Sequence, residues 1–246
     1  MEKNWIQWII TILEEYGRNF ITGTFVTLEI AILGTVLGFL LGFALGIIRS
    51  TPISSEDGFI KRFFYWIFKT ISTAYVQIFR CTPMMVQAMV LFYGFSTLGV
   101  KIPPFTAAVL VTLLNTGAYM AESVRGGIAA IDPGQLEGGK AMGMSHFQIM
   151  LHVILPQTFR NLIPEMGNQL ITNLKMTSVL NVIGVGELYF ATKTAANVYY
   201  RYFEAYLITG LIYFVLCYVA SKLLGLLEKK MQGKADYELA VEYMSD

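Results

Sequence analysis

Apolar residues in this chain are gathered into long blocks that are separated by short polar breaks. A helix that crosses a bilayer needs about 20 consecutive apolar residues, and the blocks reach or approach that length. The pattern therefore predicts an all-α, polytopic membrane protein with about five transmembrane helices. The predicted spans are Thr22–Ile48, a second region from Phe59 to Leu98 that is interrupted at Pro83, Pro103–Met120, Pro164–Phe190 and Ala205–Leu227.

The composition agrees with this pattern. Hydrophobic residues make up 55% of the chain and charged residues 14%, whereas soluble domains carry about 25% charged residues. A fully water-facing surface is therefore excluded. The chain also lacks a basic patch interleaved with aromatic residues, so no binding of nucleic acid is expected.

The first span contains four glycines at a strict spacing of four. Residues at this spacing lie on one helix face, and glycine lets a neighbouring helix approach closely. We expect packing to be the role of this face, which is formed by Gly34, Gly38, Gly42 and Gly46.

The second region is longer than a single span requires. Pro83 predicts a bend within it, because proline cannot continue a helix undisturbed. We expect a helix from Phe59 to about Phe79 that begins on the cytoplasmic side, outside the hydrocarbon, and a true crossing that begins near Pro83.

The placement of Lys and Arg predicts the orientation, because these residues accumulate in cytoplasmic loops. Most of them follow the first, third and fifth spans, which favours an external N-terminus and a cytoplasmic C-terminus. The chain is then divided into an interfacial or extracytoplasmic segment at 1–19, a transmembrane domain at 20–228 and a cytoplasmic polar tail at 229–246.

The longest polar interruption, about residues 122–157, contains two helix starts. Asp132 begins the first, with Pro at the first helical position and Gln three residues after the cap, and Ser145 begins the second, again with Gln three residues later. The first helix is predicted to stop at Gly143 and the second at Pro156. Two short capped helices form a compact element that protrudes into water, as is typical of a docking surface.

Other chemistry is poorly supported by the sequence. Residues 134–140 have the spacing of a phosphate-binding loop, but Ala141 follows where a hydroxyl should ligate magnesium, and no strand precedes them. The sequence contains no recognisable nucleophile paired with a base, so it does not indicate an enzyme. No metal site is expected either, because Cys81, Cys217, His146 and His152 lack the spacing of metal ligands.

Several short motifs, in order, resemble the polar amino acid branch of ABC importer permeases. Glu137-Gly138-Gly139, then Gly143, then Ile154-Leu155-Pro156 is similar to the EAA loop of that family. Both alanines of the usual Glu-Ala-Ala are glycine here, which costs about 2 kcal/mol of helix propensity. The flanking similarities are Arg80-Cys81-Thr82-Pro83, Ala118-Tyr119-Met120-Ala121-Glu122, Arg125-Gly126-Gly127, Pro133-Gly134-Gln135 and Leu174-Lys175-Met176-Thr177-Ser178.

The resemblance implies the type I importer permease fold, in the plasma membrane, and an ATP-driven import of polar amino acids. It implies as partners two cytoplasmic ABC ATPase subunits, which would bind ATP and magnesium, a second permease copy or paralogue, and an extracytoplasmic substrate-binding protein. Glu137 would anchor the loop in a groove of the ATPase, and Gly143 would form the turn. The remaining coupling residues implied are Gly138, Gly139, Leu155 and Pro156.

The fourth predicted span is rich in polar residues. Asn168, Thr172 and Lys175 recur at steps of four and three and so share one face, and a lysine near the bilayer centre costs about 2.5–3.5 kcal/mol. This face is interpreted as a wall of the solute path, and the alternative is hydrogen bonding between helices. The charge favours zwitterionic or acidic solutes with an α-carboxylate. The predicted path residues are Asn168, Gln169, Thr172, Lys175, Thr177 and Ser178.

Three further residues are assigned to structure or gating, namely Arg80, Pro83 and Glu122. The alternative function is an ion-coupled secondary transporter of small polar solutes. It would need a titratable relay within the membrane, for which Glu165 and Glu187 are the edge carboxylates available. It would also leave the capped loop without a role.

Overall fold

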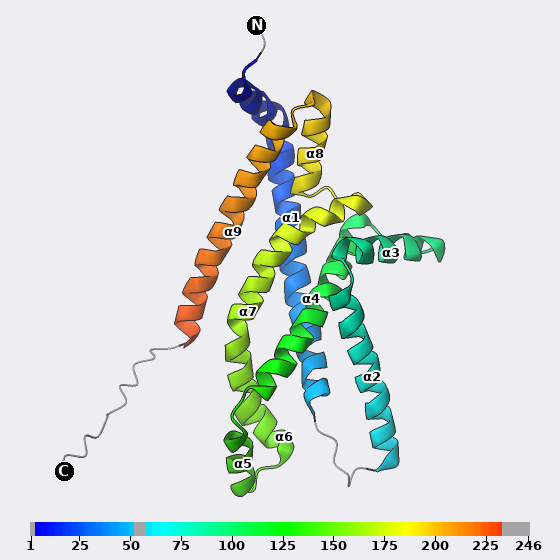
Figure 1. Ribbon diagram of the computed structural model, residues 1–246, viewed down its shortest axis with the longest axis vertical. Helices are drawn as coiled ribbons and strands as arrows, with labels where there is room; N and C mark the ends of the chain where they lie inside the picture. The colour runs from blue at the N-terminus through cyan, green and yellow to red at the C-terminus, as the bar shows by residue number, and fades with distance from the viewer. Residues whose placement is uncertain (1–2, 52–57, 233–246) are drawn as a thin grey trace, which may run out of the picture.

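The computed structural model describes residues 3–51 and 58–232, and every regular element in these ranges is helical. The all-α, polytopic fold is therefore confirmed. Figure 1 shows α1, α2, α4, α7 and α9 along the long axis, with α5 and α6 together at one end and α8 near the other. The helices are α1 (Trp5–Ser50), α2 (Phe59–Cys81), α3 (Met84–Thr97), α4 (Pro104–Ala129), α5 (Pro133–Ala141), α6 (His146–Ile149), α7 (Leu155–Met176), α8 (Leu188–Tyr199) and α9 (Tyr202–Gln232), with a π-helical turn at Met150–Ile154 and a 3₁₀ segment at Thr177–Ile183.

The N-terminal segment predicted to stand apart is continuous with the first span. α1 has 46 residues, or about 69 Å at 1.5 Å per residue, which is more than twice the thickness of the hydrocarbon, about 30 Å. Its first part packs against α8 and the start of α9, where Ile12 and Phe20 join Leu188 and Ile208 in one buried cluster. This packing explains why the helix does not break near residue 19.

The glycine face of α1 packs against α4, as predicted. A Cβ atom added at any of the four glycines would lie 2.3–2.6 Å from a side-chain atom of α4. Any larger residue would therefore separate the two helices. The residues that face the glycines, also four apart, are Thr112, Thr116, Met120 and Val124.

The second region bends at Pro83, as predicted, and its two helices are long and apolar enough to span a membrane only when taken together. α2 and α3 meet at 116°, and Figure 1 shows α2 along the long axis with α3 lying across it. With 14 residues, α3 is shorter than the roughly 20 that a crossing needs. α3 alone is therefore too short to form the crossing that is expected to begin near Pro83.

The boundaries around the loop that is predicted to be cytoplasmic also differ from the prediction. α4 continues past Met120 to Ala129, so Glu122 lies in the helix. At the far end, Pro156 does not terminate a helix, because the helical run from His146 continues through the π-helical turn into α7. Proline is tolerated near the first turn of a helix, where its missing N–H is not needed.

The predicted fourth span does not coincide with a single helix. α7 covers Leu155–Met176 and contains Pro164 inside it, whereas the predicted span ran from Pro164 to Phe190. The chain leaves α7 through the 3₁₀ segment, turns at Gly184 with a φ of 81°, and starts α8. Gly184 and the cap at Glu187 separate the two helices.

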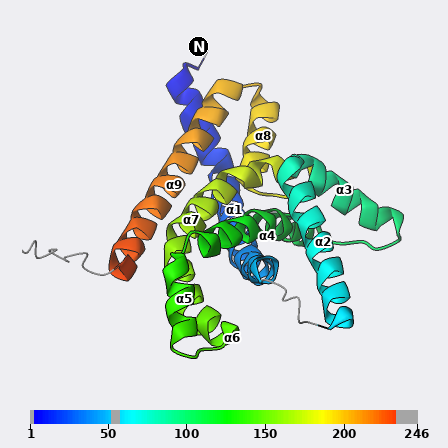
Figure 2. The same cartoon turned by 60° about the horizontal axis from the view of Figure 1, so that its bottom comes forward.

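Among the described residues, α1, α4 and α9 are long and apolar enough to span a membrane. The bent pair α2–α3 is long and apolar enough only when the two helices are taken together. α7 has 22 residues, which is long enough for a span, but its many polar residues make it less apolar than these helices. α9 extends to Gln232, so residues 229–232 are helical, and the rest of the predicted tail lies outside the described residues. Figure 2 shows the α5–α6 end of the molecule turned toward the viewer.

Candidate functional site

The hairpin of α5 and α6 is formed by the two predicted helix starts. The Asp132 side chain accepts a hydrogen bond from the N–H of Gly134 at 2.8 Å. At Ser145 the predicted capping box is complete, since Ser145 and Gln148 each accept a bond from the backbone N–H of the other. Residues 134–140 lie within α5, so they cannot form a phosphate-binding loop.

Two glycines of the hairpin have distinct structural roles. Gly143 has a φ of 78°, in the left-handed region that favours glycine, and it reverses the chain after α5. Gly139 is buried against α6, where a Cβ would lie 2.7 Å from Cγ1 of Ile149. Gly138 has open space around it. Only one of the two glycines that replace alanine is therefore required by packing.

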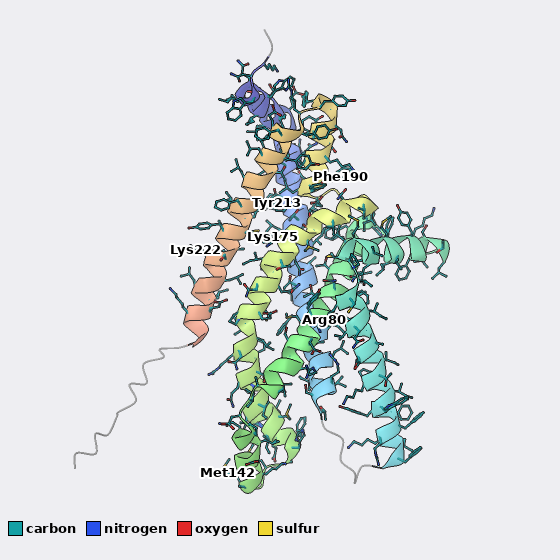
Figure 3. All side chains as sticks on the ribbon, in the orientation of Figure 1. Arg80, Met142, Lys175, Phe190, Tyr213 and Lys222 are labelled. Carbon is teal, nitrogen blue, oxygen red and sulfur yellow. The ribbon has the colours of Figure 1, made fainter. Side chains whose placement is uncertain are left out.

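The outer surface of the hairpin is open to a partner. Glu137 is exposed, and Met142 and Phe147 have 76% and 73% of their surface accessible. Figure 3 shows Met142 at the tip of the hairpin, at the end of the molecule. Exposed large apolar side chains in such a position are typical of a protein contact. Leu155 and Pro156 lie at the start of α7 instead, away from this tip.

α7 carries two polar faces. On the outer face Asn168, Thr172 and Lys175 are all exposed, as are Asn161 and Glu165 nearer its start. These five residues form one continuous row, which we call the outer row. The predicted grouping of Asn168, Thr172 and Lys175 on one face agrees with the structure.

The inner face of α7 is fully engaged by other helices. Asn173 is 2% exposed, and its Nδ2 donates hydrogen bonds to the hydroxyl oxygens of Thr35 on α1 and Thr116 on α4, each at 2.8 Å. Gln169 donates to Oδ1 of Asn173 at 3.3 Å. We call Asn173 with these two threonines the polar node, because it joins three helices.

Two predicted path residues therefore belong to the inner side. Thr177 is fully buried and donates to the carbonyl oxygen of Leu174 at 2.9 Å, so it is not accessible to a solute. Gln169 is half-buried beside Asn173. The signal for this face was present in the sequence, because residues 169, 173 and 177 recur every four positions. Ser178 is half-buried and donates to the carbonyl oxygen of Lys175 at 2.7 Å.

Glu122 joins the C-terminal part of α4 to the C-terminal end of α1. Its carboxylate accepts from Arg49 at 3.0 Å and from Arg125 at 2.5 Å. The guanidinium of Arg80 lies 5.7 Å from the centre of the Tyr119 ring, within the range of a cation–π contact. Glu122 thus links two helices, and Arg80 contacts α4 through Tyr119.

The carboxylates that a proton or ion relay would use are placed apart. Glu187 is fully buried and caps α8 by accepting from the N–H groups of Tyr189 and Phe190 at 2.8 and 2.7 Å. Glu165 lies on the outer row of α7. Within the described ranges, no group of three His, Cys, Asp or Glu side chains could hold a metal ion.

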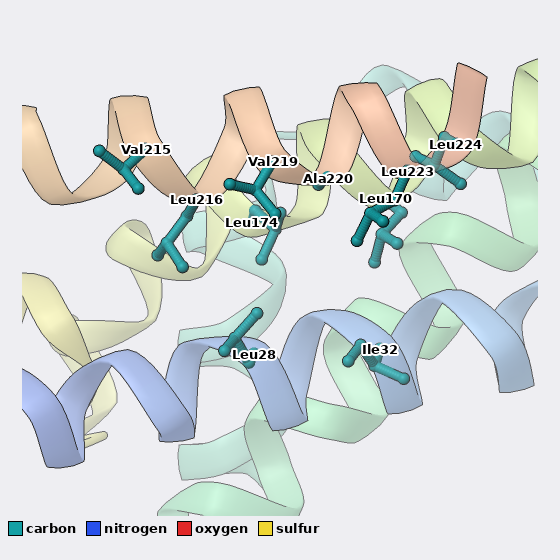
Figure 4. A pocket seen from close by; sticks show the side chains of 10 residues that line it. All are labelled: Leu28, Ile32, Leu170, Leu174, Val215, Leu216, Val219, Ala220, Leu223 and Leu224. Carbon is teal, nitrogen blue, oxygen red and sulfur yellow. The ribbon is translucent and has the colours of Figure 1, made fainter. Parts of the chain in front are cut away.

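A groove of about 370 Å³ lies between α1, α7 and α9. Figure 4 shows that aliphatic side chains from the three helices point into it, among them Leu28, Leu174 and Val219. The groove offers no polar group to a hydrophilic solute. It is therefore not a candidate for the solute path.

Comparisons with known proteins agree with this architecture. The family described as "Binding-protein-dependent transport system inner membrane component" matches residues 53–233. The chain is 37% identical over 171 residues to the arginine transport system permease protein ArtQ of Bacillus subtilis, covering 69% of this chain and 76% of that protein. It is 34% identical over 177 residues to the glutamine transport system permease protein GlnP of Escherichia coli K12, covering 71% and 81%.

Solved structures share the fold. A structure titled as the crystal structure of an amino acid ABC transporter with histidines has a TM-score of 0.80 and 34% identity, covering 94% of this chain and all of that one. An inward-facing structure of the MetNI methionine ABC transporter has a TM-score of 0.71 at 19% identity, covering 87% and 96%. The second likeness concerns the fold alone.

Proposed function

We propose that this chain, which belongs to the family of inner membrane components of binding-protein-dependent transport systems, is the permease subunit of an amino-acid ABC importer. In this role the chain forms part of the solute path, and ATP is bound and hydrolysed by a separate subunit. The capped hairpin has a role under this proposal and none in an ion-coupled transporter.

The observation that carries the proposal is the outer row of α7. Its residues extend along a helix of membrane-crossing length, and a lysine facing lipid would cost about 2.5–3.5 kcal/mol. The row must therefore face protein or a water-filled path. A second permease, either a copy of this chain or a paralogue, would cover it and enclose the path between the two outer rows. Asn168, Thr172 and Lys175 are the proposed solute contacts, with Ser178 at the end of the row.

The solute class follows from the charge of this row. Lys175 supplies a positive charge suited to an α-carboxylate, which every amino acid carries, and the amide and hydroxyl groups can bind polar side chains. The named relatives transport arginine and glutamine, which differ in side-chain charge. We propose zwitterionic or acidic amino acids for this chain. Stronger competition by arginine than by glutamine for uptake would contradict that preference.

The hairpin of α5 and α6 is the proposed contact with the ATPase. Two cytoplasmic ATPase subunits would each bind one hairpin, with Glu137 anchored in a groove and Met142 and Phe147 forming the apolar part of the contact. A complete capping box and the packing of Gly139 against Ile149 make the hairpin rigid, so that it can transmit motion of the ATPase to the membrane helices. The N-terminus would then lie outside, where a substrate-binding protein delivers the solute, and the C-terminus in the cytoplasm.

Reconstitution in vesicles with the partner ATPase tests the coupling. Glu137→Trp and Gly143→Val should abolish ATP-dependent uptake while the chain still inserts in the membrane, because one removes the anchor and the other forces the left-handed turn out of shape. Gly138→Ala is the matched control, since its Cβ meets open space, and it should retain uptake. Full uptake by both the Glu137 and Gly143 variants would contradict the proposed coupling site.

A further inference from the structure

A cationic pocket of about 430 Å³ lies where the ends of α1 and α4 meet α2. Three positive side chains line it, each from a different helix, namely Arg49, Lys69 and Arg125. It is separate from the outer row of α7 and from the hairpin, and neither transport nor coupling as proposed uses it.

The positive charge of this pocket is only partly balanced. Glu122 is the carboxylate paired with Arg49 and Arg125, which leaves an excess of two positive charges over the four side chains. The ammonium group of Lys69 makes no hydrogen bond or ion pair with any residue that the structure describes, and only the backbone carbonyl of Lys69 is bonded, to the Ser72 hydroxyl. Like charges held together destabilise the fold unless an anion joins them, so the pocket favours a negatively charged ligand.

The pocket also supplies hydrogen-bonding groups beside the charges. Thr73 lines it next to Lys69, one turn farther along α2. The Arg125 side chain is 43% exposed, so its guanidinium can donate to a ligand while it holds Glu122. Arginine and lysine together with a hydroxyl suit the oxygens of a phosphate group.

The position of the pocket points to the membrane surface as the source of that phosphate. Ser50, which also lines the pocket, is the last residue of α1, and the predicted orientation places this end in the cytoplasm. Trp66, one turn before Lys69 on α2, is 62% exposed, and tryptophan is enriched at the level of the lipid head groups. Basic pockets between helices on the cytoplasmic side bind anionic head groups.

We propose that this pocket binds the phosphate of an anionic phospholipid from the cytoplasmic leaflet. The described part of α2 buries only Ser72 and Val76, so this helix is held loosely against α1 and α4. A phosphate that contacts Lys69 on α2 together with Arg49 and Arg125 would join the three helices and relieve their mutual repulsion.

The test measures lipid retention by the full chain in its assembled complex, purified in detergent and titrated with phosphatidylglycerol. Native mass spectrometry counts the bound lipid. Lys69→Gln should weaken retention about fivefold, the effect of roughly one basic residue near an anionic surface, and Thr73→Val should weaken it less. Lys229→Gln, which removes a charge at the cytoplasmic end of α9, is the matched control and should leave retention unchanged.

Two further arms identify the source of the phosphate. Phosphatidylcholine should be retained more weakly than phosphatidylglycerol, and inorganic phosphate should compete poorly at matched ionic strength. Equal retention of phosphatidylglycerol by the unmodified chain and both pocket variants would overturn the proposal. Stabilisation by inorganic phosphate that Lys69→Gln abolishes, without any lipid preference, would overturn the lipid assignment in favour of a soluble phosphate. Neither readout depends on transport.

Discussion

The two faces of α7 are both polar, but they differ in burial and in hydrogen bonding to other helices. The inner face, with Asn173 at its centre, is buried and hydrogen-bonded to α1 and α4. The outer face, with Asn168, Thr172 and Lys175, is exposed over the same stretch of helix. One face therefore holds the fold together, and the other is free to meet a solute or a second subunit.

This difference shows that polarity within a membrane helix does not by itself indicate a transport path. Inside a bilayer a polar group must be satisfied, either by other helices or by water in a path. The inner face takes the first solution, and under the proposed function the outer face takes the second. Substitutions on the inner face should therefore change stability, and substitutions on the outer face should change transport.

The largest effect is expected from separating α1 and α4 at the polar node. Gly38→Leu would place a Cβ 2.6 Å from Cβ of Thr116 and break the bond from Asn173. We expect a loss of about 3 kcal/mol in the free energy of unfolding, at the upper end of the usual cost of overpacking, because the clash involves a packed helix seam. Unfolding by denaturant in detergent measures it. Gly210→Leu, a mid-helix glycine of α9 with open space around it, should change stability little.

A pair of identical substitutions compares the two faces directly. Asn173→Leu removes two interhelical hydrogen bonds and should cost about 2 kcal/mol of stability, given about 0.6–1.7 kcal/mol for each such bond in a membrane. Asn168→Leu should change stability by less than about 0.5 kcal/mol but reduce uptake. Equal thermal stability of the two variants would remove the distinction between the faces.

The charge of the outer row is tested by Lys175→Met. Loss of a charged hydrogen bond to a solute carboxylate, worth about 1.5 kcal/mol, should lower the apparent affinity for the transported amino acid about tenfold and leave the thermal stability unchanged. Uptake by the assembled importer, measured over a range of solute concentrations, gives the affinity. Lys193→Met on α8 is the matched control, and an equal loss there would count against a specific role for Lys175.

The smallest effect separates the two threonines. Thr177→Val loses the bond to the carbonyl of Leu174 and the side-chain hydrogen bond with Tyr213, and it should cost about 1 kcal/mol without a change in uptake. Thr172→Val should do the reverse, with reduced uptake and unchanged stability. If Thr177→Val altered the affinity for the solute, Thr177 would have to become exposed to the path during transport.

Much of the fold could be predicted from the sequence. The long apolar blocks, the bend at Pro83, the glycine face of α1 and the two helix starts at Asp132 and Ser145 all rest on local physics and agree with the structure. The boundaries of the fourth span could not be predicted in this way, because Pro156 and Pro164 normally mark helix ends and both lie within α7. Pro156 stands in the first turn of α7, where proline is tolerated, and Pro164 lies inside the helix.

The candidate site, like the fold, could be predicted in part from the sequence and in part only from the tertiary structure. The sequence by itself determined that α7 is polar, that the hairpin has two capped helices and that Gly143 forms its turn, because these follow from residue type and spacing along one segment. Only the tertiary structure decided that Asn173 binds Thr35 and Thr116, and that Gly139 rather than Gly138 is required. Those contacts join residues far apart in the chain, and a polar side chain reveals its partner only when the helices are packed together.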